Sequence, residues 1–159
     1  MTEFTHLSHD GAVRMVDVGD KPVTRRTAVA EGQVLMQPAT LRLITAGTAQ
    51  KGNVLETARL AGIMAAKRTP EWIPLCHVLP LTCVTLEFST PNSACLLVQA
   101  TAIADAKTGV EMEALTAVSA ACLTVYDMCK SADREMEITG IRLMQKSGGK
   151  SGDFRRSPG

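Results

Sequence analysis

The longest helical pattern in the chain is the stretch KTGVEMEALTAVSAACLTVYDMCK at residues 107–130. It contains no proline, and its apolar residues recur at steps of three and four, which predicts a helix whose buried face is formed by Met112, Leu115, Val118, Cys122, Val125 and Cys129. Thr108 and Glu111 have the spacing of a capping box, so we expect both to satisfy free amides at the helix start. The helix is apolar on most sides, which indicates a place deep in a core or against another subunit.

Each charged residue on this helix is expected to have a partner or to face a polar pocket, because an unpaired charge in apolar surroundings costs free energy. Asp127 and Lys130 lie three residues apart and share a face, either as an ordinary surface ion pair or as an acid and a base at a pocket wall. Glu113 and Asp127 also share a face, but they lie roughly 21 Å apart at about 1.5 Å per residue. One helix therefore cannot offer both to a small substrate. We expect a site shared between two subunits whose helices pack antiparallel near Ala120.

Composition narrows the class of protein. The 159 residues suit one domain with a core of its own, and the formal net charge of +1 provides no bulk attraction for nucleic acid or acidic membranes. We find no apolar run long enough for a membrane span and no apolar signal core. The five cysteines form no Cys-x-x-Cys pair, and three alternate with apolar residues, as reduced core thiols do. We therefore expect a cytoplasmic protein that binds neither nucleic acid nor membrane.

The order of the predicted elements indicates the fold class. Periodicity and turn residues predict two further helices at 39–46 and 53–68, and four strands at 23–36, 82–88, 95–103 and 136–143, the last with a bulge at Gly140. With the helix at 107–130, this is the ferredoxin-like βαββαβ order of an α+β protein, an antiparallel sheet with helices on one face. We assign residues 1–20 to a flexible or surface-lying segment, 21–154 to a single catalytic domain and 155–159 to a tail.

Three cations stand out in this nearly neutral chain. Lys51 lies just before a helix whose predicted cap is Asn53, where free amides and the helix dipole favour an anion; a solvated loop lysine is the alternative. Arg26 is either a solvated residue of a strand edge or part of a cationic pocket. Lys67 is interpreted as a partner of a helix C-terminus.

Two loops carry further candidates. Cys76 and His77 end a proline-bent loop, but adjacent side chains make poor paired ligands and no second cluster completes a zinc site, so His77 is interpreted as a donor or acid in a pocket. The segment KSGGKSGD at 146–153 is not a Walker A loop, because no helix follows it, and a flexible linker is the alternative to a phosphate loop. If the lysines of this segment and the cations named above lie in one pocket, that pocket would select a polyanionic small molecule rather than a long nucleic acid.

Five blocks of the sequence strongly resemble the molybdenum cofactor biosynthesis protein C family: KGN at 51–53, IPLCH at 73–77, KTGVEMEALT at 107–116, YDMCK at 126–130 and KSGGKSG at 146–152. The likeness covers about residues 15–154, with a departure at Val78, where the family usually has proline. The resemblance implies a ferredoxin-like subunit of a homohexamer, a trimer of dimers with sites at the dimer interface. It also implies a lyase that converts 3′,8-cyclo-7,8-dihydro-GTP into cyclic pyranopterin monophosphate and diphosphate.

The resemblance further implies roles for single residues. The family's catalytic aspartate falls at Asp127 and its acid–base lysines at Lys51 and Lys130. The implied substrate-binding positions are the loop residues Leu75, Cys76 and His77, the base-recognising pair Met112 and Glu113, and the phosphate-facing Arg26, Lys67 and Lys146. No metal or resident cofactor is implied, and Mg²⁺ accompanying the triphosphate is left open.

The implied reaction sets requirements on the site, and two other functions would suit the same fold. Opening a purine ring and reclosing it as a pterin requires repeated proton transfers, and lysines crowded by other cations are expected to have lowered pKa values. An RNA-binding module has the same element order, but it stacks bases on sheet aromatics, and Phe88 stands alone here. A non-catalytic nucleotide sensor would use the same cations and tolerate Asp127→Asn.

Overall fold

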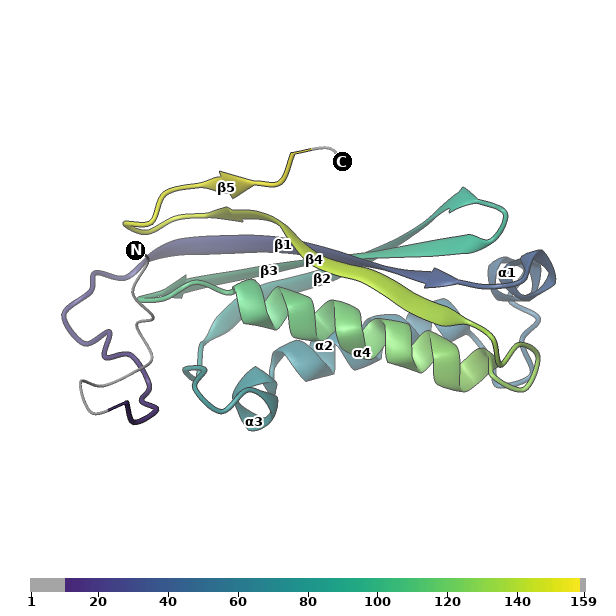
Figure 1. The fold of residues 1–159 in the computed structure, drawn as a ribbon, viewed down its shortest axis with the longest axis horizontal. Coiled ribbons are helices and arrows are strands. Elements are labelled where there is room, and N and C mark those ends of the chain that lie inside the picture. Colours follow the sequence, from purple (N-terminus) through teal and green to yellow (C-terminus); the bar gives the residue numbers. More distant parts are fainter. Residues whose placement is uncertain (1–10, 158–159) are drawn as a thin grey trace.

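A computed structural model of the chain describes residues 11–157, whose helices and strands follow the predicted order (Figure 1). The elements are β1 (Thr24–Leu35), α1 (Pro38–Thr45), α2 (Val54–Ala66), α3 (Thr69–Trp72), β2 (Leu81–Asn92), β3 (Cys95–Ala106), α4 (Glu111–Cys129), β4 (Glu137–Ser147) and β5 (Phe154–Arg155). Residues 1–10 of the predicted flexible segment lie outside the described part. Among the described helices, none has the length and apolar content that a membrane crossing requires.

All five strands belong to one antiparallel sheet in the order β2-β3-β1-β4-β5. The central strand β1 pairs with β3 on one side and β4 on the other. The crossover after β1 leads to β2, the β2–β3 hairpin places β3 between β2 and β1, and the crossover through α4 places β4 on the free side of β1. Figure 1 shows α2 and α4 covering the same face of the sheet. The predicted ferredoxin-like α+β fold is confirmed, with a short fifth strand added at one edge.

Small side chains let α4 lie close to the sheet and to α2. A Cβ added at Gly32 of β1 would come 2.7 Å from Val118, and one added at Gly62 of α2 would come 2.9 Å from the carbonyl oxygen of Ala117. Ala120 is also buried within the single chain. The small residues thus serve packing inside one subunit, and the prediction that two subunits' helices meet near Ala120 stays a prediction.

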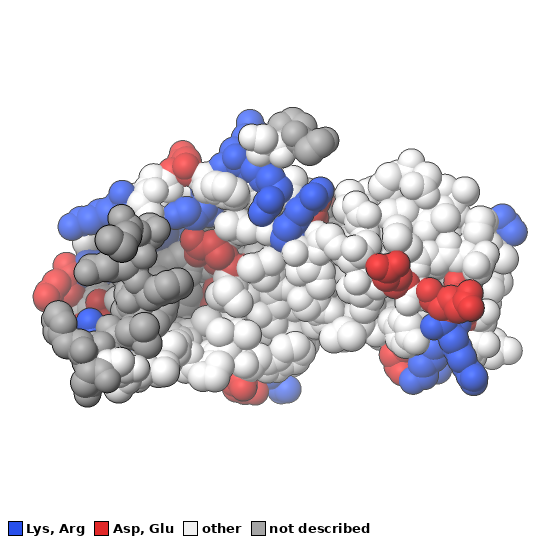
Figure 2. All heavy atoms as spheres, in the orientation of Figure 1, with Lys and Arg blue, Asp and Glu red and all other residues white. Residues whose placement is uncertain are grey.

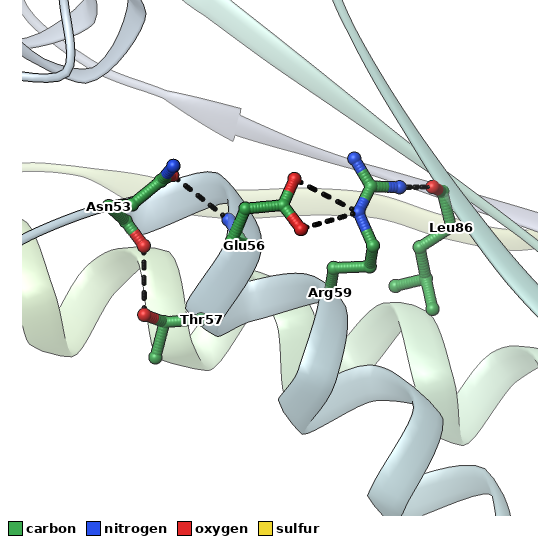
Figure 3. Close-up of polar contacts among 5 residues, drawn as sticks. All are labelled: Asn53, Glu56, Thr57, Arg59 and Leu86. Carbon is green, nitrogen blue, oxygen red and sulfur yellow. Dashed lines mark hydrogen bonds and ion pairs between the residues drawn. The ribbon is translucent and has the colours of Figure 1, made fainter.

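The predicted cap of α2 is confirmed and anchors the loop before the helix (Figure 3). The side-chain oxygen of Asn53 accepts a hydrogen bond from the Glu56 amide at 3.1 Å, and the Thr57 hydroxyl donates to the Asn53 carbonyl at 2.8 Å. Arg59 pairs with Glu56 and donates to the Leu86 carbonyl, which ties α2 to β2. The start of α2, and with it the chain leaving Lys51, is thereby held in place.

The predicted capping box at the start of α4 is wrong. Val110 is the N-cap residue, and it makes no side-chain cap hydrogen bond. The Glu111 carboxylate lies instead 3.8 Å from Lys146 Nζ on β4. Lys146, which is distant in the sequence, therefore replaces the free amides at the helix start as the partner of Glu111. The Glu111 side chain faces the two cavities described below.

The predicted bulge in β4 is confirmed at Gly140. This residue has a φ of +63°, in the left-handed region that favours glycine, and the β1–β4 register shifts between Glu31 and Gln33. Pairing resumes at Arg142, whose Nε and Nη2 donate to Glu31 Oε1 at 2.9 and 2.7 Å. The bulge thus sets which side chains of β4 meet β1 toward the C-terminal loop.

Candidate active site

The predicted site residues gather at the two ends of α4. At its C-terminal end lies the lysine–aspartate cluster, which consists of Lys51, Asp127 and Lys130. Near its N-terminal end lies the loop cavity, a cleft of about 700 Å³ whose lining includes Leu75, Cys76, His77, Met112 and Glu113. Figure 2 shows charged side chains where α4 ends, separated by an uncharged area from those toward the other end. The structure therefore brings the predicted residues together as two groups, with Lys67 in neither of them.

The lysine–aspartate cluster joins the loop before α2 to the end of α4. Lys130 Nζ donates to Asp127 Oδ1 at 2.6 Å, and Lys51 Nζ lies 3.3 Å from Asp127 Oδ2 and 3.0 Å from the Asp127 carbonyl oxygen. All three side chains are about half exposed, at 47%, 59% and 52% for Lys51, Asp127 and Lys130. In a single chain the cluster is thus a surface ion-pair group, the simpler of the two interpretations.

Hydrogen bonds and charge set the protonation states of this cluster. The bonds from Lys130 and Lys51 hold the pKa of Asp127 below its ordinary value, and their charges act in the same direction. The Asp127 carboxylate in turn raises the pKa of Lys130. The expectation that crowding by cations lowers lysine pKa values is therefore wrong for Lys130, because an anion sits between the two ammonium groups.

The loop cavity lies between the segment after α3, the start of α4 and the chain before β1. His77 Nε2 lies 2.8 Å from the carbonyl oxygen of Val16. Since a carbonyl only accepts, Nε2 carries the hydrogen and donates it. Val13, Val16 and Val18 line the cavity as well. These three valines belong to the segment 1–20 that was predicted to be flexible or surface-lying, and they form one wall of the cavity.

Glu113 is the buried acid of the loop cavity. Its side chain points inward from the first turn of α4, and the residue is 3% exposed. Burial raises the pKa of Glu113 from 4.5 to about 7, opposed by a bond to its own backbone and supported by the charge of Glu111. Burial, and then Glu113, also raise the pKa of the Cys76 thiol. At neutral pH the cavity thus holds a carboxyl group able either to donate or to accept a hydrogen bond.

The burial of Glu113 predicts a pH-dependent stability. Below pH 4.5 Glu113 is protonated in both the folded and the unfolded protein. Between pH 4.5 and about 7 only the folded protein keeps this proton. The stabilising contribution of the protonated Glu113 is therefore lost as the pH rises through this window. We expect a loss of about 1–3 kcal/mol in the free energy of unfolding that Glu113→Gln abolishes. Denaturant unfolding at pH 5 and pH 8 measures it. Glu56→Gln, on the exposed face of α2, is the control and should keep the wild-type loss; an unchanged loss in Glu113→Gln would contradict the prediction.

A second cleft, the glycine-loop cavity, adjoins the first. It measures about 600 Å³ and shares Lys21, Thr108, Gly109 and Glu111 with the loop cavity. Four cations line it, namely Lys21, Arg26, Lys107 and Lys150. The Thr24 hydroxyl, also in its lining, is a buried side-chain oxygen without a hydrogen-bond partner among the described residues. Cations and a free hydroxyl beside the carboxyl-bearing cavity suit a ligand that has a ring at one end and phosphates at the other.

Comparison with known proteins places the chain in a family. Residues 15–149 match the sequence profile of the MoaC family. The chain belongs to the MoaC family. It is 58% identical to a cyclic pyranopterin monophosphate synthase of Cereibacter sphaeroides over 158 residues, which cover 99% of both chains. It is 59% identical to one of Chloroflexus aurantiacus over 155 residues, 97% of this chain and 95% of that one, and 58% identical to one of Chloroflexus aggregans over 156 residues, 97% and 94% of the two.

In this MoaC family chain the predicted phosphate-facing residues are not placed alike. Arg26 lines the glycine-loop cavity, and Lys146 lies beside it, where it donates to the Ser151 hydroxyl. Lys67 is the C-cap residue of α2, is exposed, and lines neither cavity. The structure therefore joins Arg26 and Lys146 to the site but leaves Lys67 outside the two cavities of its own chain.

Several residues of the site escaped the sequence-based predictions. Lys21, Lys107 and Lys150 are cavity cations that were not named as site residues. Lys107 and Lys150 lie in blocks of the family resemblance, whereas no pattern distinguishes Lys21 from a solvated lysine. Val16 belongs to a short apolar run in a polar segment, and that run was a usable signal. Within residues 11–157, no three His, Cys, Asp or Glu side chains are grouped so that they could hold a metal ion.

Proposed function

We propose that the chain is a cyclic pyranopterin monophosphate synthase, a lyase that converts 3′,8-cyclo-7,8-dihydro-GTP into cyclic pyranopterin monophosphate and diphosphate in molybdenum cofactor biosynthesis. The observation that carries this proposal is the identity of 58% to proteins of that name over 99% of both chains. The site supports it, since a buried carboxyl cavity and a cation-lined cavity adjoin, as a purine-derived triphosphate requires.

The loop cavity receives the ring. Glu113, protonated in part of the molecules, hydrogen-bonds the N–H and C=O edge of a guanine-like base, while Met112 and the loop from Leu75 to His77 pack around it. Its apolar walls exclude water from the ring during the proton transfers.

The glycine-loop cavity receives the triphosphate. Diphosphate leaves when a ribose-derived hydroxyl attacks the first phosphorus, which closes the cyclic phosphate. Lys107, Lys146 and Lys150 neutralise the charge that grows on the leaving group. We propose no resident cofactor, and a Mg²⁺ ion bound to the triphosphate would enter with the substrate.

The lysine–aspartate cluster of a neighbouring subunit completes the site. Asp127 of the same chain lies roughly 21 Å along α4 from Glu113, beyond the reach of one substrate molecule. The ionised Asp127 holds Lys130 protonated, so Lys130 serves as an acid, with Lys51 as the second proton donor, and the carboxylate takes protons back. Lys67, outside the cavities of its own chain, reaches the phosphates only from a neighbour.

An oligomer accounts for the exposed apolar side chains of the helical layer. Leu60 and Met64 of α2 and Leu123 of α4 are 62%, 41% and 55% exposed. Apolar side chains of this size suit a contact with another subunit rather than with water. We assign the assembly as a homohexamer built as a trimer of dimers, located in the cytoplasm and binding neither nucleic acid nor membrane.

Direct turnover tests the proposed function. Purified protein incubated with 3′,8-cyclo-7,8-dihydro-GTP should release diphosphate and cyclic pyranopterin monophosphate in equal amounts, followed by chromatography and a diphosphate assay. GTP, which lacks the 3′,8 bond, is the control and should release none. Binding of the cyclised nucleotide without turnover would instead indicate a nucleotide sensor and overturn the proposal.

A further inference from the structure

Arg26 hydrogen-bonds to two segments of backbone that are separate in the sequence. The residue is 8% exposed and lies near the start of β1, the central strand of the sheet. Its Nε donates to the Ala106 carbonyl at 3.3 Å, Nη2 to the Lys107 carbonyl at 3.3 Å, and Nη1 to the Gly148 carbonyl at 3.1 Å. The Ala106 and Lys107 carbonyls lie where β3 ends and the turn to α4 begins, and the Gly148 carbonyl begins the loop after β4. The guanidinium therefore bridges two segments that are about forty residues apart in the sequence.

The glycine pair of the C-terminal loop is shaped around this guanidinium. Gly148 and Gly149 have φ values of +92° and +81°, which disfavour any residue with a side chain. A Cβ on Gly149 would overlap Arg26 Nη1, and one on Gly148 would overlap the Arg25 carbonyl oxygen. The loop thus crosses directly over the Arg26 side chain, with no room for a larger residue.

Both bridged segments carry the cations of the glycine-loop cavity. The turn contributes Lys107 and Thr108, and the loop contributes Lys150 and Ser151. Lys146 donates to the Ser151 hydroxyl and so fixes the far side of the same loop. The distance between the two cationic walls is consequently set by the contacts that join them. Arg26 joins them through three hydrogen bonds, whereas the Lys146–Glu111 ion pair is longer, at 3.8 Å.

Arg26 has little capacity left for a ligand. A guanidinium has five N–H donors, and three of them are used on protein carbonyls. A lysine would keep the charge, but its single ammonium cannot reproduce a planar fork that serves three carbonyls in fixed directions. Charge and geometry can therefore be separated by experiment.

We propose that Arg26 is a positioning residue, a clamp that holds the loop at 148–151 against the turn at 107–108 and so sets the spacing of the cations that bind the substrate's phosphates. This proposal rests on the proposed function for the identity of the substrate, but not for the anion site. It changes the role expected for Arg26 from a direct phosphate ligand to the residue that shapes the site.

The test compares Arg26→Lys, Arg26→Met and the neighbouring control Arg25→Lys, an exposed position on the same strand. Inorganic tripolyphosphate is the probe, with its affinity measured by calorimetry, and hydrogen exchange reports on the amides at 148–152. A clamp predicts that Arg26→Lys weakens binding roughly tenfold, as much as Arg26→Met, with faster exchange in the loop. Arg25→Lys should match wild type. Wild-type affinity and exchange in Arg26→Lys would overturn the clamp, because charge alone would then suffice.

Kinetics separate the clamp from a general loss of structure. With the cyclised nucleotide, Arg26→Lys should raise KM roughly tenfold while kcat changes less than about threefold. Gly149→Ala, which displaces the guanidinium from the opposite side, should reproduce the effect and serves if Arg26→Lys does not fold. Additive effects of Arg26→Lys and Gly149→Ala in the double variant would count against the clamp. Absence of turnover in wild type with the predicted pattern of tripolyphosphate binding would overturn the proposed function and leave the clamp standing.

Discussion

Replacing Asp127 by asparagine is expected to lower kcat for cyclic pyranopterin monophosphate formation by about a thousandfold. Asparagine has the same size, but it is neutral and cannot accept hydrogen bonds from Lys51 and Lys130 as a carboxylate does. The carboxylate is ionised because both lysines lower its pKa, so the substitution removes a full negative charge from the cluster. It also removes the main cause of the raised pKa of Lys130 and thereby weakens the control of that proton.

Single-turnover measurements with 3′,8-cyclo-7,8-dihydro-GTP provide the readout, because they exclude effects on product release. Glu56→Gln is the matched control, since Glu56 also forms an exposed ion pair on a helix, at 61% side-chain exposure, and lies outside both cavities. It should retain turnover within about twofold of wild type. Turnover of Asp127→Asn close to that of Glu56→Gln would show that the cluster is only a surface ion-pair group and would favour the sensor interpretation.

The fold was predictable because its signals are local. Periodicity of 3.6 in α4, alternation in β2 and the turn residues between elements each act within a few residues, and together they allow few topologies. The capping box failed for the opposite reason. Glu111 has a suitable local spacing to Thr108, but its carboxylate lies near Lys146, whose place depends on the pairing of β1 with β4.

The sequence indicated which residues form the lysine–aspartate cluster, but not their pKa shifts or their burial. The resemblance named Asp127, Lys51 and Lys130, and the structure places them within hydrogen-bond reach of one another. Counting nearby cations nevertheless gave the wrong direction for the pKa of Lys130, because the geometry of the intervening carboxylate decides it. Arg26 shows the same limit, since the sequence has two adjacent arginines on a strand and only the structure distinguishes the buried one.

Mixed oligomers are expected to recover activity from two inactive variants. Glu113→Ala removes the acid of the loop cavity, and Asp127→Asn disables the lysine–aspartate cluster at the other end of α4. If each site takes Glu113 from one subunit and Asp127 from its partner, a mixed twofold dimer contains one site with both defects and one intact site. Random pairing makes about half of the dimers mixed, so co-expression should restore about a quarter of wild-type activity.

The matched control is a mixture of Asp127→Asn with Lys51→Ala. Both residues belong to the same cluster, with Lys51 Nζ 3.3 Å from Asp127 Oδ2. Every site of a mixed dimer therefore contains one defect, and no activity should return. Distinct affinity tags and native mass spectrometry establish the proportion of mixed dimers in each preparation. Recovery in the first mixture alone requires that the two ends of α4 act from different subunits, because the roughly 21 Å between them on one chain rules out a single shared substrate. No recovery despite confirmed mixing would mean that each chain binds and converts its substrate alone, and the two-subunit site would have to be abandoned.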